Sequence, residues 1–73
     1  MRKSGDIQIR FGRRVLELRK AKGLSQEDLA AECGLDRTYI SGIERGRRNI
    51  SLLSIEAVAK GLGTSISDLF EGM

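Results

Sequence analysis

Apolar residues recur along the chain three or four positions apart, which places them on one face of an α-helix. The first such stripe, over 6–22, is formed by Ile7, Phe11, Val15 and Leu18. Shorter stripes follow over about 25–34, 36–46, 51–62 and 65–70. The alternation of apolar and polar residues that indicates a strand does not extend over any useful length. The 73-residue chain is therefore predicted to be all-α, with five short helices in a single domain over 1–73.

Capping residues and glycines predict where these helices begin and end. Five residues are expected to accept a hydrogen bond from a free backbone N–H at a helix start: Asp6, Ser25, Asp36, Ser51 and Ser65. Asp28 follows Ser25 by three positions, which predicts a capping box with Asp in place of Glu. Gly23, Gly34 and Gly46 stand where the first three helices should stop, because glycine adopts the left-handed conformation of a helix end.

The inward-facing positions predict one small core. In the later helices they are Leu29, Ala30, Cys33, Ile40, Ile43, Leu52, Ile55, Val58, Ala59, Leu62 and Leu69. Domains of this size commonly rely on disulfides, metals or oligomerisation. With one cysteine and no histidine, no disulfide or zinc site is expected, and Cys33 is interpreted as a small core side chain. A homodimer is therefore expected.

The same composition argues against an enzyme. Without histidine or clustered carboxylates, acid–base and nucleophilic catalysis have almost no candidate groups. No catalytic residue, cofactor, metal site or small-molecule ligand is predicted. Neither a secretory signal nor an apolar run long enough to span a membrane is found, so the protein is expected to be cytoplasmic.

Two helices joined by a tight turn stand out in the middle of the chain. The turn over 33–36 contains Gly34, and such a turn makes the two helices cross steeply. Apolar residues are expected to pack in the angle between the two helices, namely Leu29, Leu35, Ile40 and Ile43. The segment over about 25–46 is therefore predicted to be a helix-turn-helix.

The outward face of the second of these helices carries candidate DNA-reading groups. At about 100° per residue, Thr38, Gly42 and Arg45 point away from the core, and Arg37 and Ser41 flank them. Arginine can donate two hydrogen bonds to guanine, and threonine offers a hydroxyl and a methyl group to thymine. Gly42 is predicted to let the helix approach the floor of the groove. The alternative interpretation is an ordinary solvated face.

Basic residues after this helix suit contacts to the DNA backbone. Arg45, Arg47 and Arg48 surround a glycine, and phosphate contacts of this kind fix register without reading sequence. Gln26 lies in the first turn of the preceding helix, where the N-terminus favours an anion. Charge is also segregated, since positions 1–24 hold eight basic and two acidic residues and 25–35 hold three acidic and no basic ones. Such a polar molecule can orient itself on a polyanion, although charge alone fits a solvated face equally well.

The residues of this segment resemble those of a known family. The stretches LSQEDLA (24–30) and CGLDRTYISGIERG (33–46) are similar to the helix-turn-helix of the lambda repressor and Cro type, also called the XRE family. The similarity extends from about Phe11 to Phe70 and includes LGTSISDLF (62–70). Within the family, DRTYISGIER (36–45) and the short chain most resemble the controller proteins of restriction–modification systems.

The resemblance implies a compact five-helix, lambda-repressor-like domain that binds double-stranded, pseudo-palindromic operator DNA as a homodimer. The helix over 36–46 would enter the major groove, with half-sites about 34 Å apart. Base contacts are expected from Arg37, Thr38, Ser41 and Arg45, of which Arg45 also suits the backbone. Backbone contacts are expected from Gln26, Tyr39, Arg47, Arg48 and Asn49. Tyr39 could instead serve mainly in packing.

Controllers of this type activate and then repress their own operon, so a contact with RNA polymerase is also implied. Glu27, with Asp28 and Glu32 beside it, is the candidate surface. A phage-type repressor, an antitoxin-like autorepressor and a protein-interaction module that has lost DNA binding are the alternatives.

Two further groups have structural interpretations. Arg19 and Glu44 match a pair that links the first helix to the third in this family, and they are expected to form a structural ion pair. Apolar residues within 51–73 exceed the needs of one small core and are predicted to form the dimer interface. They are Leu53, Ile66, Phe70 and Met73. Phe70 could instead fill the core of the monomer.

Overall fold

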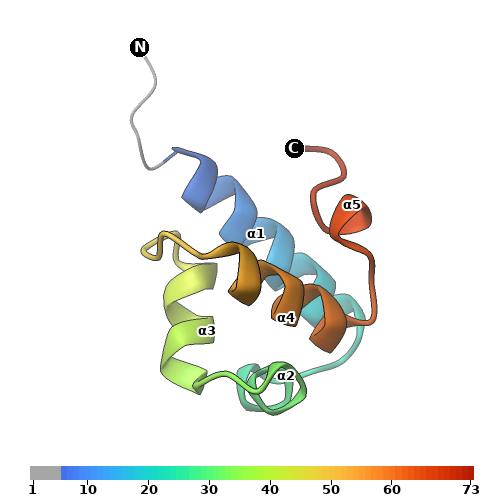
Figure 1. The fold of residues 1–73 in the computed structure, drawn as a ribbon. Coiled ribbons are helices and arrows are strands. Elements are labelled where there is room, and N and C mark those ends of the chain that lie inside the picture. Colours follow the sequence, from blue (N-terminus) through green and yellow to red (C-terminus); the bar gives the residue numbers. More distant parts are fainter. Residues whose placement is uncertain (1–5) are drawn as a thin grey trace.

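Five helices follow one another along residues 6–73, the part of the chain described by a computed structural model. They are α1 (Asp6–Ala21), α2 (Gln26–Cys33), α3 (Arg37–Glu44), α4 (Leu52–Leu62) and α5 (Ile66–Leu69) (Figure 1). Within these residues no strand is present, so the predicted all-α fold is confirmed. No helix of this region combines the length and apolar character needed to cross a membrane.

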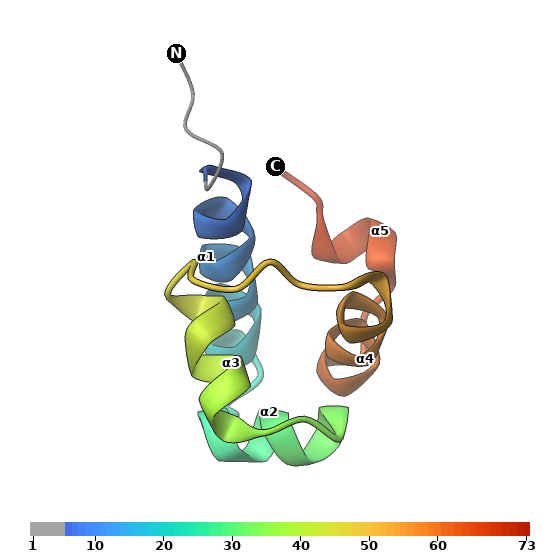
Figure 2. The same ribbon diagram turned by 60° about the vertical axis from the view of Figure 1, so that its left-hand side comes forward.

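The helices pack around a common centre. α1 packs against α3, α2 packs against both α3 and α4, and α4 packs against α5. Figure 2 shows α1 and α3 along one side, α4 and α5 along the other, and α2 closing the base between them. α3 therefore lies at the edge of the bundle, supported by two helices.

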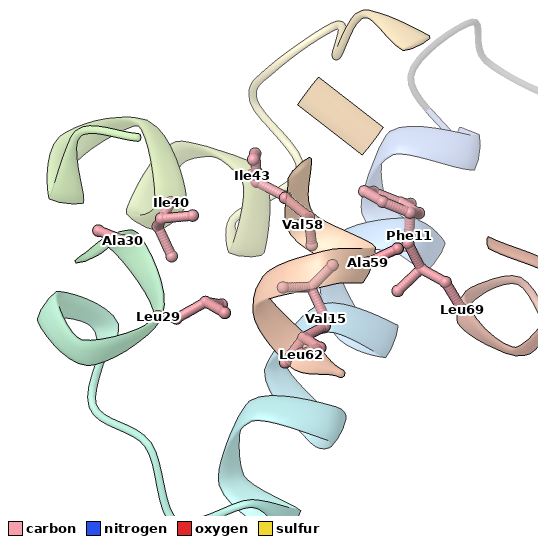
Figure 3. Close-up of a cluster of buried hydrophobic side chains, with 10 residues drawn as sticks. All are labelled: Phe11, Val15, Leu29, Ala30, Ile40, Ile43, Val58, Ala59, Leu62 and Leu69. Atoms are coloured by element: carbon pink, nitrogen blue, oxygen red, sulfur yellow. The ribbon is translucent and has the colours of Figure 1, made fainter. Parts of the chain in front are cut away.

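The core contains ten buried apolar side chains contributed by all five helices (Figure 3). They are Phe11, Val15, Leu29, Ala30, Ile40, Ile43, Val58, Ala59, Leu62 and Leu69. Two predicted core positions are wrong, since Ile7 is 52% exposed and Leu52 is 83% exposed. Both residues lie in the first turn of their helices. Cys33, also expected in the core, is half-buried.

Serine side chains cap α2, α4 and α5, as their positions predicted. The Ser25 hydroxyl accepts from the backbone N–H of Asp28 at 2.9 Å, and the Asp28 carboxylate accepts from the backbone N–H of Ser25 at 3.0 Å. This reciprocal pair completes the predicted capping box at the start of α2. Ser51 and Ser65 cap α4 and α5 through single hydrogen bonds of the same kind.

The two aspartates expected as caps behave differently. Asp36 occupies the N-cap position of α3, but its side chain makes no capping hydrogen bond. Asp6 lies within α1, where its carboxylate accepts a hydrogen bond from Arg10 Nε at 2.9 Å. This pairing joins residues four positions apart on one helix, and the cap expected from Asp6 at the start of α1 stays a prediction.

Two glycines hold the helix-turn-helix in place. Gly34 ends α2 with a φ of +68°, a conformation that strains any residue with a side chain. Gly12 lies where α1 meets α3, and a Cβ added there would collide with the backbone carbonyl oxygen of Ile43. α3 is therefore held directly against the backbone of α1.

Side chains of α1 tie the end of the chain to the bundle. The Arg14 guanidinium donates to the carbonyl oxygens of Leu69, at 3.2 Å, and Asp68, at 2.7 Å. The ring of Phe70 stacks on that of Phe11, with centroids 5.1 Å apart and an interplanar angle of 29°. Phe70 thus contributes to the packing of the monomer, which is the alternative interpretation of this residue.

Candidate nucleic-acid interface

α3 has one buried and one exposed face. Ile40 is fully buried and Ile43 is 2% exposed, whereas Arg37 and Thr38 are exposed and Ser41 is half-buried. The two isoleucines fix the rotation of the helix about its axis. The polar residues predicted to face DNA are therefore turned outward.

A hollow of about 360 Å³ opens along this outward face. Its lining joins α3 to the segment that follows it and consists of Thr38, Ser41, Gly42, Arg45, Arg47 and Arg48. Because three of these six residues are exposed arginines, the hollow is both concave and positively charged. Residues predicted from the sequence as base contacts and as backbone contacts thus share one surface.

Among the predicted contacts of this region that lie outside that lining are Arg37 and Asn49. Arg37 is exposed at the start of α3. Asn49 is exposed and borders a second, more apolar hollow of about 190 Å³, whose other lining residues include Phe11, Ile50 and Phe70. Both side chains are accessible, each at one end of the α3 surface.

The space beside Gly42 is filled by another residue of the chain. The sequence predicted that the missing side chain would let α3 approach the groove floor. In the structure, a Cβ added at Gly42 would lie 3.0 Å from both Cγ and Nε of Arg48. The guanidinium carbon Cζ of Arg48 lies over the ring of Tyr39, 5.0 Å from its centroid. This part of α3 is therefore covered by Arg48.

The ion pair expected between Arg19 and Glu44 is present and buried. Arg19 Nε lies 2.6 Å from Glu44 Oε2 and Nη2 lies 3.0 Å from Oε1, with the two side chains 11% and 4% exposed. Arg19 Nη1 also donates to the carbonyl oxygen of Leu24 at 2.9 Å. The hydrogen bond to Glu44 raises the pKa of Arg19 above its ordinary value despite burial, so the guanidinium stays charged.

Gln26 is part of the same network, which its sequence position did not predict. Its side-chain Nε2 donates to Glu44 Oε1 at 3.0 Å. The Glu44 carboxylate at the end of α3 therefore joins residues of α1 and α2. Because a glutamine side-chain amide has two N–H donors, one of them is still free of this bond and can serve another acceptor.

The acidic residues proposed to meet RNA polymerase lie on α2. Glu27 and Glu32 are exposed. Asp28 is exposed as well, but its carboxylate completes the capping box. The hydrogen bonds it accepts from the Ser25 backbone and side chain lower the pKa of Asp28 below its ordinary value. Glu27 and Glu32 are thus the two of this group whose carboxylates have no capping role.

The predicted dimer residues divide into two kinds. Leu53 is 79% exposed and Ile66 is 46% exposed. Phe70 and Met73 are half-buried and pack against the core of the monomer. Leu52, which was expected inside, adds to the exposed apolar surface beside Leu53. Leu53 and Ile66 are thus the predicted dimer residues that leave apolar surface exposed, as Ile7 and Ile9 of α1 also do.

The side chains that could bind a metal ion are dispersed over the described part of the chain. Over residues 6–73, no three His, Cys, Asp or Glu side chains lie close enough together to hold a metal ion. Burial raises the pKa of the half-buried Cys33 thiol, which keeps it protonated at neutral pH. The arrangement of α2 and α3 is that of a helix-turn-helix protein.

Comparisons with known proteins agree with this class. A family model described as helix-turn-helix matches residues 15–69, and the family is one of DNA-binding regulators rather than enzymes. The control protein C.MunI of Mycoplasma sp is 54% identical over 66 residues, which cover 89% of this chain and 89% of the relative.

Two solved structures are similar in fold and sequence. The restriction–modification controller protein C.AhdI from Aeromonas hydrophila has a TM-score of 0.87 at 51% identity, covering 89% of this chain and 98% of its own. The controller protein C.Esp1396I, solved as a tetramer in complex with its natural 35 base-pair operator, has a TM-score of 0.83 at 45% identity, covering 88% of this chain and 84% of its own. The present chain therefore belongs to the helix-turn-helix family and, within it, to the restriction–modification controller proteins.

Proposed function

We propose that this protein controls transcription by binding a pseudo-palindromic operator as a homodimer, with α3 of each protomer in the major groove. The observation that carries the proposal is the hollow along α3, where hydroxyl and arginine side chains from two adjacent segments meet on one concave surface. Positive charge supplies affinity for the phosphate backbone, and outward-facing hydrogen-bonding groups supply the means to distinguish bases.

Base readout is assigned to the outward residues of α3. Arg37 is placed to donate two hydrogen bonds to a guanine, and Thr38 and Ser41 are placed to use their hydroxyl groups. A bidentate hydrogen-bonded contact of good geometry discriminates against the wrong base by about 1–3 kcal/mol. Arg45, in the lining of the hollow, suits either a base or a phosphate.

Backbone contacts are assigned to the residues around this helix. They are Gln26, Tyr39, Arg47, Arg48 and Asn49. Gln26 keeps one amide N–H for a phosphate after donating to Glu44, and it lies at the N-terminus of α2, which favours an anion. The buried Arg19–Glu44 pair and the bond from Gln26 to Glu44 support this assignment because together they join α1, α2 and α3.

Dimerisation is assigned to α4 and α5. Leu53 and Ile66 are exposed and apolar, and Phe70 and Met73 support them from within the monomer. With the two α3 helices related by a two-fold axis, half-sites would lie about 34 Å apart.

The regulatory role proposed is activation of the protein's own restriction–modification operon at low concentration and repression at high concentration, in the cytoplasm. C.Esp1396I is a tetramer on its operator, which is the assembly that two adjacent dimer sites would give. Contact with RNA polymerase is assigned to Glu27, with Asp28 and Glu32 beside it. A Glu27→Lys variant should keep operator affinity and lose activation in a reporter assay, whereas unchanged activation would contradict this assignment.

Selection of duplexes from a random pool tests the proposal as a whole. The pure protein, at physiological ionic strength, should enrich a pseudo-palindrome whose half-sites are about one helical turn apart. A control variant with both Arg37→Ala and Ser41→Ala keeps the phosphate contacts and should bind duplexes with little enrichment. Failure of the unaltered protein to enrich any motif would contradict the proposal and favour a protein-interaction module.

A further inference from the structure

The side chain of Arg48 lies back across α3, between a glycine and an aromatic ring. Its Cγ and Nε lie only 3.0 Å from the position that a Cβ of residue 42 would take. Its guanidinium carbon lies 5.0 Å from the centroid of the Tyr39 ring. We infer that Gly42 is a positioning residue. Because it has no side chain, it leaves room on α3 for Arg48 to stack on Tyr39 and point its charge at the DNA-facing hollow. We call the space between Gly42 and the Tyr39 ring the seat of Arg48.

Gly42 needs an explanation because glycine disfavours a helix. It lies inside α3, where glycine is less favourable than alanine. Its backbone does not require glycine, since it is not among the glycines of residues 6–73 with a positive φ. The three atoms nearest to an added Cβ all belong to the Arg48 side chain. The absence of a side chain at position 42 therefore serves Arg48.

The seat assists binding by reducing the freedom that Arg48 loses on DNA. A free arginine side chain samples many rotamers, and ordering them opposes binding. Stacking on an aromatic face restricts the guanidinium in advance and attracts its charge. Arg48, Gly42 and Thr38 line the same hollow, so the arginine is held at the surface that the proposed function assigns to DNA.

This inference rests on the proposed function and deepens it by giving Gly42 a role through Arg48. It differs from the expectation drawn from the sequence, in which Gly42 lets the DNA itself approach. The two explanations predict different results when the arginine is removed. If Gly42 contacts DNA, Gly42→Ala should still weaken binding when Arg48 is absent. If Gly42 only makes room for Arg48, Gly42→Ala should have no effect once Arg48 is removed.

A double-mutant cycle with Gly42→Ala and Arg48→Ala separates them, with affinity for the selected operator and for an unrelated duplex measured by fluorescence anisotropy. Gly42→Ala should weaken binding to both duplexes by about two- to fivefold, the factor that corresponds to losing an exposed cation–π contact. In the Arg48→Ala background, Gly42→Ala should have no further effect. The melting temperature of Gly42→Ala should equal or exceed that of the unaltered protein, because alanine favours the helix.

The free protein supplies a second readout that does not depend on DNA. Arg48 lies over the ring of Tyr39, the one tyrosine of the chain, while the two phenylalanine rings stack on each other, so a ring current at Arg48 is expected to come from Tyr39. In NMR spectra the Arg48 side-chain protons should be shifted upfield in the unaltered protein. Gly42→Ala and Tyr39→Leu should each return them toward ordinary values, and Tyr39→Phe should not.

Three results would overturn the inference. They are a binding penalty of Gly42→Ala that persists in the Arg48→Ala background, no penalty at all in the presence of Arg48, or Arg48 proton shifts that Gly42→Ala leaves unchanged. An absence of any duplex preference in the unaltered protein would instead overturn the proposed function, and the NMR result would still report on the seat.

Discussion

The side-chain amide of Gln26 donates to the carboxylate of Glu44, with 3.0 Å between Nε2 and Oε1. The same carboxylate holds Arg19 through two hydrogen bonds, of 2.6 and 3.0 Å. One acidic residue at the end of α3 therefore joins the first helix to the start of the second. This junction sets the position of α3 and of the proposed phosphate contact at Gln26 together.

Replacing Glu44 by alanine should destabilise the fold by about 3–5 kcal/mol, since it leaves the Arg19 guanidinium buried without its partner. Urea unfolding followed by circular dichroism measures the change. The matched control is Glu56→Ala, which removes an exposed carboxylate from α4 and should change stability by no more than about 0.5 kcal/mol. A cost for Glu44→Ala of about 1 kcal/mol or less, the value of an exposed pair, would contradict the structural role.

Features set within one or two turns of a helix were predictable from the sequence. The capping box of Ser25 and Asp28 and the buried face at Ile40 and Ile43 follow from residue spacing alone. Gly34 ends α2 where its position predicted. Each of these depends on neighbours that the chain brings together locally, so the pattern contains the information.

Features that depend on long side chains meeting across the fold were not predictable. The bond from Gln26 to Glu44 and the placement of Arg48 over Gly42 depend on rotamers chosen by the folded surroundings. The 83% exposure of Leu52, which belongs to an apolar stripe, was not predictable from the stripe either. The spacing of apolar residues predicts which face of a helix is apolar, but it does not predict which residues cover that face.

The Asp28 carboxyl should titrate below its ordinary pKa of 3.8, because it accepts hydrogen bonds from Ser25 in the folded state. A group whose pKa is lowered by folding adds stability above its unfolded pKa and loses it as the pH falls through the folded value. The capping contribution to stability is therefore present at neutral pH and fades below 3.8. NMR titration of the carboxyl carbon measures the midpoint.

Ser25→Ala is the control for that titration, since it removes the hydroxyl of the capping box. The midpoint of Asp28 should move back toward its ordinary value. A midpoint at or above 3.8 in the unaltered protein would show that the carboxylate does not cap α2 in solution.

Introducing aspartate at both Leu53 and Ile66 should convert dimers into folded monomers and weaken operator binding. The two side chains are exposed in the monomer, so the charges should disturb the association and leave the core intact. Light scattering gives the mass, and circular dichroism verifies the helical fold. Phe70 is a poor target for this purpose because it stacks on Phe11. Dimers that survive both substitutions would place the interface elsewhere.

The proposed recognition of DNA depends on α3 reading bases while the arginines after it hold phosphates. Its most direct test is the affinity of Arg37→Ala and Arg48→Ala for a panel of operators that differ by one base pair at a time. Arg37→Ala should cost about 1–3 kcal/mol on the best operator and erase the preference at one position of each half-site. Arg48→Ala should weaken all operators alike and reduce the salt dependence by about one unit. An unchanged preference at every position in Arg37→Ala would contradict the central claim.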